Sequence, residues 1–207
     1  MRDPRHTRRM KICFVCMGNI CRSPTAEGIM QAKVDALTAP QDAPDGSAHD
    51  IELDSAGTGG WHRGERADER ARAEAHSRGI ELTSRARQVH AGDFAYFDLL
   101  VAMDRSNHAD LLDLAPDAEG RAKVRLLLEF ADAGAGRPLD LDDPNLDVPD
   151  PYYGGPSGFA DVFDLIDGAC DGLLAHVLAT RPSPPPAEPV PSATPERSAE
   201  GQEAPGS

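Results

Sequence analysis

The sequence predicts an α/β protein, a single domain built on a doubly wound, four-stranded parallel sheet with helices on both faces. Short apolar runs alternate along the chain with longer segments whose apolar residues follow helical spacing. The 207 residues are 40% hydrophobic and 27% charged, which is the balance of one ordinary globular domain with tails. The sequence has no apolar run of 18 residues, so we expect no transmembrane helix.

The first half of the domain is predicted to contain two strands and two helices. Residues 12–15 form a continuous apolar run, as expected of a strand that is buried on both faces. Ser23 and Pro24 suit the N-cap and the first position of a helix. The apolar stripe of that helix comprises Ala26, Ile29, Met30, Val34 and Leu37. Residues 51–56 suit a strand, and residues 66–78 suit a polar helix that ends before a glycine.

The second half continues the alternation. Residues 97–103 predict a strand, Asp104 suits the N-cap of a leucine-rich helix, and residues 123–128 predict the fourth strand. Ser157 suits the N-cap of the last helix. The apolar stripe of this last helix comprises Phe159, Val162, Phe163, Ile166, Cys170, Leu173, Leu174 and Val177.

The domain is predicted to span residues 11–180, between two segments that lack the composition of a folded core. Residues 1–10 are basic and predicted to be flexible, and translation from either Met1 or Met10 is compatible with them. Residues 181–207 hold eight of the 18 prolines and one valine as their only large aliphatic residue, so we expect a disordered tail. Residues 39–50 are predicted to form a flexible loop.

Charge and cysteine content narrow the classes of partner and compartment. A formal net charge of −14 disfavours binding to nucleic acids or anionic membranes, so neither is expected as a partner. The N-terminus lacks a secretory signal, and Cys13, Cys16 and Cys21 lie within nine residues, which argues against a disulfide scaffold. We therefore expect reduced thiols and a cytoplasmic protein, and release by a non-classical route stays open.

The segment between the first strand and the first helix has the composition of an anion-binding loop. Doubly wound sheets bind ligands beyond the carboxyl ends of their strands, which is where this segment lies. Gly18 and Asn19 tolerate positive φ, so the loop can curl its amides inward at a helix N-terminus and bind an anion. Arg22 adds a planar fork that suits phosphate oxygens. The loop lacks GK[ST], so it is not a Walker loop.

Cys16 begins this loop and is the candidate nucleophile. Amides and a helix N-terminus of this kind lower the pKa of a cysteine to roughly 3.5–7.5, and Ser23 can donate a hydrogen bond to the sulfur. A thiolate below a bound phosphate can attack phosphorus and form a phosphocysteine without a metal or a cofactor. The alternative is that Cys16 is a buried thiol at the end of a strand and that Arg22 is a surface charge.

Beginning at Cys16, the segment CMGNICRSPTAEGIM resembles the signature of the low-molecular-weight protein tyrosine phosphatases. Further motifs of that family are SAGTGGWH at residues 55–62, RQV at 87–89 followed by Phe94 and VAMD at 101–104, and DPYYG at 150–154. The resemblance covers about residues 11–180. It implies a small doubly wound fold and hydrolysis of phosphotyrosine in proteins or peptides, with inorganic phosphate or vanadate as inhibitors.

The resemblance also implies roles for individual residues. Cys16 is expected to be the nucleophile, Arg22 to bind the phosphoryl oxygens, and Asp150 to act first as general acid and then as general base. The residues expected to bind phosphate are Met17, Gly18, Asn19, Ile20, Cys21, Arg22 and Ser23. Asn19, Ser23 and Ser55 are expected to support the loop.

The resemblance further implies a ring slot and a redox partner. Trp61, Tyr152 and Tyr153 are expected to wall the slot that holds the substrate ring. Cys21 corresponds to a second loop cysteine that can form a disulfide with the nucleophile, although a simple packing role is the alternative. Ser84 stands where the family often has histidine, and its effect on the rate stays open.

Several of these residues allow other interpretations. Asp150 lies among ten aspartates in residues 132–171, and only its motif distinguishes it from Asp147. Cys13 and Cys16 form a C-x-x-C pair, but no second pair accompanies them, so a zinc or redox site is disfavoured. An arsenate reductase needs a relay of thiols, which this chain lacks outside the loop region because Cys170 is predicted to lie in the core.

Two further alternatives concern specificity and activity. Protein-arginine phosphatases of this fold tend to carry threonine at the position of Ile20 and to lack the paired tyrosines, so this chain favours phosphotyrosine. A catalytically inactive phosphotyrosine-binding module is disfavoured because Cys16, Arg22 and Asp150 are all present.

Overall fold

The computed structural model describes residues 9–37, 51–131, 143–153 and 157–180. Residues 1–8 of the N-terminus predicted to be flexible over 1–10, the loop predicted at 39–50 and the predicted disordered tail at 181–207 lie outside the described residues, so their character stays a prediction. Met10, at the end of the predicted flexible segment, is instead the first residue of a strand. Among the described residues, no helix combines the length and the apolar character that crossing a membrane requires.

The sheet has four parallel strands, as the sequence predicts, and their spatial order is β2-β1-β3-β4. The strands are β1 (Met10–Cys16), β2 (Ile51–Gly57), β3 (Leu99–Ala102) and β4 (Val124–Leu126). The chain runs from β1 to β2 on one side and then crosses to β3 on the other, so the strand order reverses at β1. Ligand sites form beyond the carboxyl end of such a strand, which here is Cys16.

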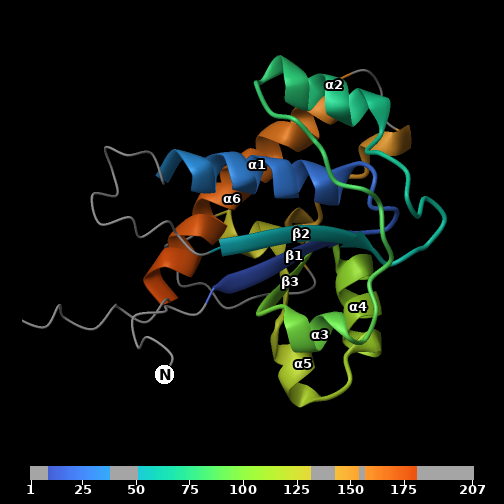
Figure 1. Cartoon of the computed structure of the whole chain (residues 1–207), viewed down its shortest axis with the longest axis vertical. Helices are drawn as coiled ribbons and strands as arrows, with labels where there is room; N and C mark the ends of the chain where they lie inside the picture. The colour runs from blue at the N-terminus through green and yellow to red at the C-terminus, as the bar shows by residue number, and fades with distance from the viewer. Residues whose placement is uncertain (1–8, 38–50, 132–142, 154–156, 181–207) are drawn as a thin grey trace, which may run out of the picture.

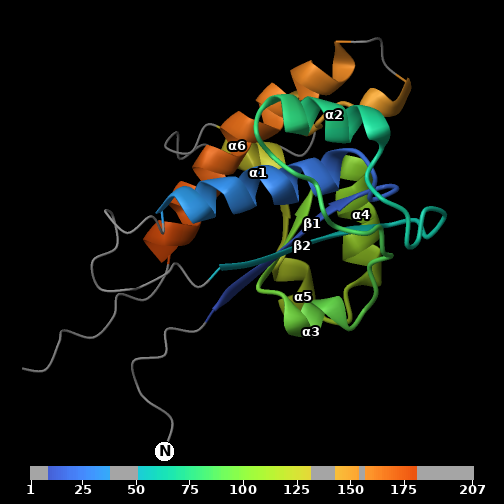
Figure 2. The same ribbon diagram turned by 45° about the horizontal axis from the view of Figure 1, so that its top comes forward.

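Helices cover both faces of the sheet (Figures 1 and 2). One face carries α1 (Arg22–Leu37) and α6 (Gly158–Thr180), and α2 (Glu69–Ser77) packs against both of these helices. The other face carries α3 (Asp93–Tyr96), α4 (Arg105–Leu114) and α5 (Ala118–Ala122). Three short 3₁₀ turns complete the described elements: η1 (Leu127–Phe130), η2 (Pro144–Leu146) and η3 (Pro151–Tyr153).

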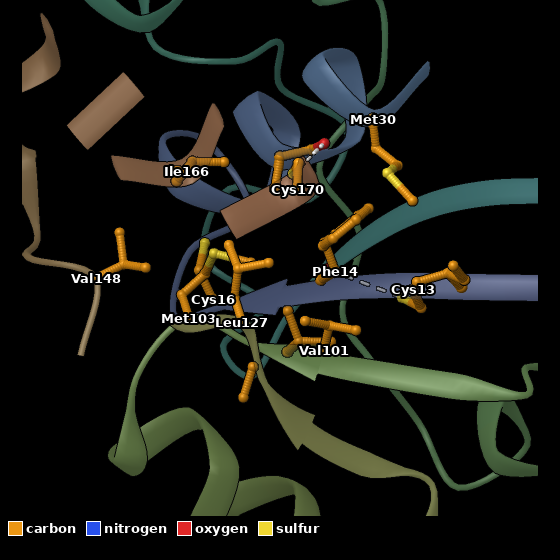
Figure 3. Packing of buried hydrophobic residues seen from close by; sticks show 14 of the residues in the cluster. Cys13, Phe14, Cys16, Met30, Val101, Met103, Leu127, Val148, Ile166 and Cys170 are labelled. Carbon is orange, nitrogen blue, oxygen red and sulfur yellow. Dashed lines mark hydrogen bonds between the residues drawn. The ribbon is translucent and has the colours of Figure 1, made fainter. Parts of the chain in front are cut away.

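The core lies between the sheet and its helices, and the central strand is buried throughout. The four residues 12–15 of β1 have no exposed surface, which explains their unbroken apolar run. The whole predicted stripe of α6 is buried, and Cys170 packs in the core with its Sγ 3.9 Å from the carbonyl oxygen of Ala26 (Figure 3). This buried frame holds the end of β1 in place.

The first predicted helix cap is wrong, and the reason lies in the functional loop. α1 begins at Arg22 rather than after Ser23, because the carbonyl of Cys21 already accepts a bond from the N–H of Thr25 at 3.4 Å. The hydroxyl of Ser23 lies 3.1 Å from Cys16 Sγ and does not serve as a cap. Pro24 is then in the first turn, where a missing N–H costs no helical bond.

The remaining boundaries differ by a few residues. α2 begins three residues later than predicted because Asp68 is its N-cap and accepts from the N–H of Arg70. Asp104 caps α4 as predicted, accepting from the N–H of Asn107 at 2.7 Å. The strand predicted at 97–103 is shorter in the structure, and the one predicted at 123–128 passes into a 3₁₀ turn. Neither α3 nor α5 was predicted, since helices of four and five residues have too few turns to show periodicity.

Candidate active site

The loop after β1 wraps around the sulfur of Cys16. Cys16 is the last residue of β1, and Figure 3 shows it at the carboxyl end of that strand. The backbone N–H of Asn19 donates to Cys16 Sγ at 3.2 Å, and Ser23 Oγ lies 3.1 Å from the same sulfur. Two polar groups of the loop are therefore placed to stabilise negative charge on Cys16, since hydrogen bonds to the charged form favour it.

Asn19 gives the loop its curl. It has a φ of 56°, and it is the only described residue other than glycine with positive φ, whereas Gly18 does not adopt the positive φ that the sequence suggested. The side chain holds this conformation, because Nδ2 donates to Ser23 Oγ at 3.0 Å and to Ser55 Oγ at 2.8 Å. Its Oδ1 accepts from the backbone N–H of Arg87 at 2.8 Å.

A glycine at the end of β2 lets the loop lie against the sheet. A Cβ at Gly57 would stand 2.7 Å from the carbonyl oxygen of Met17 and 3.1 Å from the nitrogen of Asn19. Both neighbours are backbone atoms, so a side chain here would force the loop away from β2. The motif that begins at Ser55 therefore supports the loop in two ways. Gly57 leaves room for the backbone of the loop, and the hydroxyl of Ser55 accepts from Asn19.

Glu27 extends the support network, and the sequence analysis missed it. Ser55 Oγ donates to Glu27 Oε2 at 2.6 Å. Burial raises the pKa of the Glu27 carboxyl, while hydrogen bonds from Ser55 and Ser84 act in the opposite direction. Ser84 thus connects to Asn19 through Glu27 and Ser55. Glu27 lies one helical turn after Ser23, and this spacing of four residues was the signal that could have identified it.

The guanidinium of Arg22 is buried and held by two elements. Its Nη1 donates to Asp104 Oδ2 at 2.6 Å and to the carbonyl oxygen of Val148 at 3.0 Å. Its Nη2 lies 3.5 Å from Asp150 Oδ2. Burial opposes the charge, but Cys16, Asp104 and Asp150 together raise the pKa of Arg22. Sequence reasoning placed Asp104 at a helix N-cap and in a family motif but missed its contact with Arg22, since nothing local to Asp104 reveals that contact.

These groups surround one cavity of about 300 Å³. Trp61 and Tyr152 stand at its mouth with exposed fractions of 73% and 41%. The side chain of Tyr153 lies outside what the structure describes, so its predicted place in the slot stays a prediction. The lining residues are Cys16, Met17, Gly18, Ile20, Cys21, Arg22, Trp61, His62, Asp150 and Tyr152.

The two candidate acids lie in different surroundings. Asp150 lines the cavity, and its Oδ1 accepts from the backbone N–H of Tyr152 at 3.1 Å. Both oxygens of Asp147 accept from the guanidinium of Arg105, which lowers the pKa of Asp147. Asp147 is therefore held ionised at a distance from the cavity lining, and Asp150 is the carboxylate that can reach a bound ligand.

The other cysteines differ from Cys16 in their surroundings. Cys21 lines the cavity, and burial, followed by the charges of Asp68 and Cys16, raises its pKa to about 12. Burial also raises the pKa of Cys13, although Arg87 beside it acts in the opposite direction. All four cysteines are free thiols. Within the described residues, no group of three or more His, Cys, Asp or Glu side chains is arranged to hold a metal ion.

Comparisons with known proteins show which family the chain resembles over most of its length. Residues 11–182 match the model of the family described as low molecular weight phosphotyrosine protein phosphatase. A low molecular weight protein-tyrosine-phosphatase of Streptomyces coelicolor is 46% identical over 167 residues, which are 81% of this chain and 93% of that protein.

Solved structures show the same fold. A crystal structure of a protein tyrosine phosphatase from Entamoeba histolytica, with Hepes in its active site, is 37% identical and has a TM-score of 0.67, covering 82% of this chain and 97% of that one. A crystal structure of a Drosophila arginine phosphatase is 30% identical and has a TM-score of 0.68, covering 81% and 98%. The fold therefore does not separate the two phosphatase specificities.

Proposed function

The chain belongs to the low molecular weight phosphotyrosine protein phosphatase family, and we propose that it hydrolyses phosphotyrosine in proteins through a phosphocysteine on Cys16. The observation that carries this proposal is the convergence of Cys16, Arg22 and Asp150 on one cavity. A nucleophile, an anion-binding fork and a carboxylate around one cavity are the groups that phosphoryl transfer through an enzyme intermediate requires.

In the first step, the substrate phosphoryl group binds in the loop between the amides and the guanidinium of Arg22. Because Asp104 and Val148 hold Nη1, the guanidinium is oriented before the substrate arrives. Cys16 Sγ attacks phosphorus as the thiolate, and the bond from phosphorus to the phenolic oxygen breaks. The fork of Arg22 neutralises the charge on the equatorial oxygens in the transition state.

Asp150 handles the protons of both steps. In the first step it donates its proton to the leaving phenolate, so that tyrosine departs neutral. In the second step the resulting carboxylate takes a proton from a water molecule that attacks phosphorus. The sulfur–phosphorus bond breaks, inorganic phosphate forms, and Cys16 returns to the thiolate, which the N–H of Asn19 and the hydroxyl of Ser23 are placed to stabilise. No metal or cofactor takes part.

The mouth of the cavity supports an aromatic substrate. Trp61 and Tyr152 offer exposed aromatic surface beside the loop, and such surface binds a phenyl ring by stacking and burial. Hydrolysis of phosphoarginine is the second candidate, because an arginine phosphatase shares the fold. Ile20 and the paired tyrosines favour phosphotyrosine. Free thiols agree with a cytoplasmic location, which we also propose.

Replacing Cys16 with serine tests the proposal. The variant keeps Arg22 and the loop amides, so we expect it to bind vanadate or inorganic phosphate while turnover of phosphotyrosine peptides falls below detection. Comparison of phosphotyrosine and phosphoarginine peptides with the unmodified protein identifies the substrate class. Activity of the serine variant within about tenfold of the unmodified protein would contradict the assignment of the nucleophile.

A further inference from the structure

Arg70, in the first turn of α2, makes an unusual number of directed contacts for an exposed residue. Its Nε and Nη2 donate to the two oxygens of Asp68, each at 3.0 Å. Its remaining terminal nitrogen, Nη1, donates to the carbonyl oxygen of Tyr152 at 3.2 Å. The guanidinium also lies 5.3 Å from the ring centre of Tyr152 and 4.6 Å from that of Phe159 at the start of α6.

These contacts join two parts of the active site that are far apart in the sequence. The backbone N–H of Asp68 donates to the carbonyl oxygen of Ile20 at 2.7 Å, which ties Asp68 to the phosphate-binding loop. The carboxylate of Asp68 fixes Arg70 by a fork, and Arg70 holds the carbonyl of Tyr152. The N–H of Tyr152 in turn donates to Asp150 Oδ1 at 3.1 Å. A continuous series of hydrogen-bonded residues, Asp68, Arg70 and Tyr152, therefore connects the loop to Asp150.

The position of α2 in the fold is consistent with a link between the loop and the segment of Asp150. α2 packs against both α1, whose N-terminus closes the loop, and α6, which follows the segment of Asp150 (Figures 1 and 2). Asp150 itself has a partly exposed side chain. Its contacts are the N–H of Tyr152, two residues along the same segment, and Arg22 at 3.5 Å. The position of Asp150 therefore depends on how firmly residues 150–152 are held.

We propose that Arg70 is a positioning residue that ties residues 150–152 to the phosphate-binding loop and so holds Asp150 in reach of the leaving group. The proposal rests on the proposed function of Asp150 as general acid. Arg70 does not line the cavity that holds Cys16, Arg22 and Asp150, so it acts on the reaction through Asp150 and on ring binding through Tyr152. Lysine cannot replace it, because one ammonium group cannot span both Asp68 oxygens and the Tyr152 carbonyl.

The test is a double-mutant cycle on the full chain with aryl phosphates of different leaving groups. We expect Arg70→Ala to lower kcat on phenyl phosphate by about 10-fold to 100-fold, the scale of a misplaced catalytic group. The loss is expected to shrink for para-nitrophenyl phosphate, whose leaving group needs less protonation, while inhibition by vanadate stays unchanged. Arg70→Lys is expected to behave like Arg70→Ala. In an Asp150→Asn background, Arg70→Ala is expected to cause no further loss of kcat.

Arg78→Ala is the matched control. Arg78, at the end of α2, also pairs with carboxylates and lies over a phenylalanine of α6, with its guanidinium 4.4 Å from the ring centre of Phe163. Among the described residues its partners are Glu74, Asp164 and Phe163, none of which belongs to the segment of Asp150, so its loss reports the general cost of loosening α2 from α6. We expect its kcat to be unchanged for both substrates.

The outcomes distinguish failure of the positioning role of Arg70 from failure of the general-acid role of Asp150. Additive losses in the double variant, equal losses for all leaving groups, or a loss confined to KM for peptides would overturn the positioning role of Arg70. If Asp150→Asn lowers kcat and Arg70→Ala leaves it unchanged, the positioning role fails and the proposed general acid stands. If Asp150→Asn leaves kcat and its dependence on the leaving group unchanged, the proposed acid itself fails, and the role of Arg70 fails with it.

Discussion

Replacing Asp104 with alanine is expected to damage both the stability of the domain and its phosphate site. Asp104 uses one oxygen for the N–H of Asn107 at the start of α4 and the other for Arg22 Nη1. The side chain of Arg22 is only 4% exposed, so its charge loses a buried partner in the variant. The carbonyl of Val148 and the more distant Asp150 are the contacts that remain.

The expected magnitude has two parts. Leaving one partner of a buried ion pair uncompensated costs about 3 kcal/mol, the lower end of the usual range, since the side chain of Asp104 is 18% exposed. Loss of the helix cap costs about 1 kcal/mol. Asp104→Ala is therefore expected to lower the free energy of unfolding by about 4 kcal/mol. Asp104→Asn has one acceptor oxygen in place of two, so when it keeps the cap its amide NH2 faces the donor Nη1 of Arg22. Its expected cost is therefore the loss of the ion pair without the loss of the cap, about 3 kcal/mol.

Activity is expected to fall for a geometric reason. Without Asp104, the guanidinium of Arg22 is free to turn toward Asp150, which draws its fork away from the phosphate oxygens. We expect kcat/KM to fall about 10²-fold in Asp104→Ala, the usual effect of losing one transition-state donor, and vanadate affinity to fall with it.

Equilibrium denaturation with urea and steady-state kinetics on para-nitrophenyl phosphate measure these effects. Asp117→Ala is the control, because the side chain of Asp117 caps α5 through the N–H of Gly120 and forms no ion pair within the described part of the chain. Its expected cost is the cap alone, about 1 kcal/mol, with normal activity. If Asp104→Ala loses no more stability than Asp117→Ala and keeps its vanadate affinity, the buried pair does not hold Arg22 and the reasoning is refuted.

Three further predictions concern the loop. Arg22→Lys is expected to lower kcat and vanadate affinity, each by about 10²-fold, because lysine keeps the charge but not the fork; near-normal inhibition by vanadate would mean that the amides bind alone. After peroxide and then dithiothreitol, unmodified protein is expected to recover activity much better than Cys21→Ser, because a disulfide with Cys21 protects oxidised Cys16 from higher oxidation. Equal recovery would leave Cys21 a packing role. Burial raises the pKa of Glu27, so its stabilising effect is present below the ordinary glutamate pKa and is lost as pH rises through the folded value. Relative to Glu27→Gln, unmodified protein should thus lose stability from acid to neutral pH in urea denaturation, and a relative gain would contradict this.

The parts of the structure that follow from local pattern were predictable. The apolar run of β1 and the long apolar stripe of α6 are both buried. The spacing of apolar residues along the chain indicates which positions are buried, so both elements could be predicted. The proposed phosphate-binding loop was also recognisable, since Asn19, Arg22 and the helix start lie within a few residues of Cys16. Each of these signals needs only neighbours in the chain.

The missing parts depend on contacts between distant residues. Asp104 meets Arg22 across 82 positions, and Arg70 meets Tyr152 across the same separation. A single sequence carries no periodicity that links such pairs, so Asp104 was assigned a role only as a helix cap, and Arg70 was not distinguished within its predicted polar helix. Ser23 failed as a predicted cap for a related reason, because its hydroxyl serves Cys16 and Asn19 in preference to the helix it begins.

The covalent intermediate on Cys16 is the central claim, and direct mapping of the phosphoryl group tests it. Asp150→Ala is mixed with para-nitrophenyl phosphate, and the reaction is stopped within the first turnover by denaturation at neutral pH. This pair suits the test because the good leaving group departs without a general acid, whereas loss of the general base slows hydrolysis of the intermediate. Digestion and mass spectrometry are expected to find one phosphoryl group on the peptide that contains Cys16, and none in Cys16→Ser. Release of para-nitrophenol without a phosphoryl group on Cys16, or with one on another residue, would contradict the mechanism.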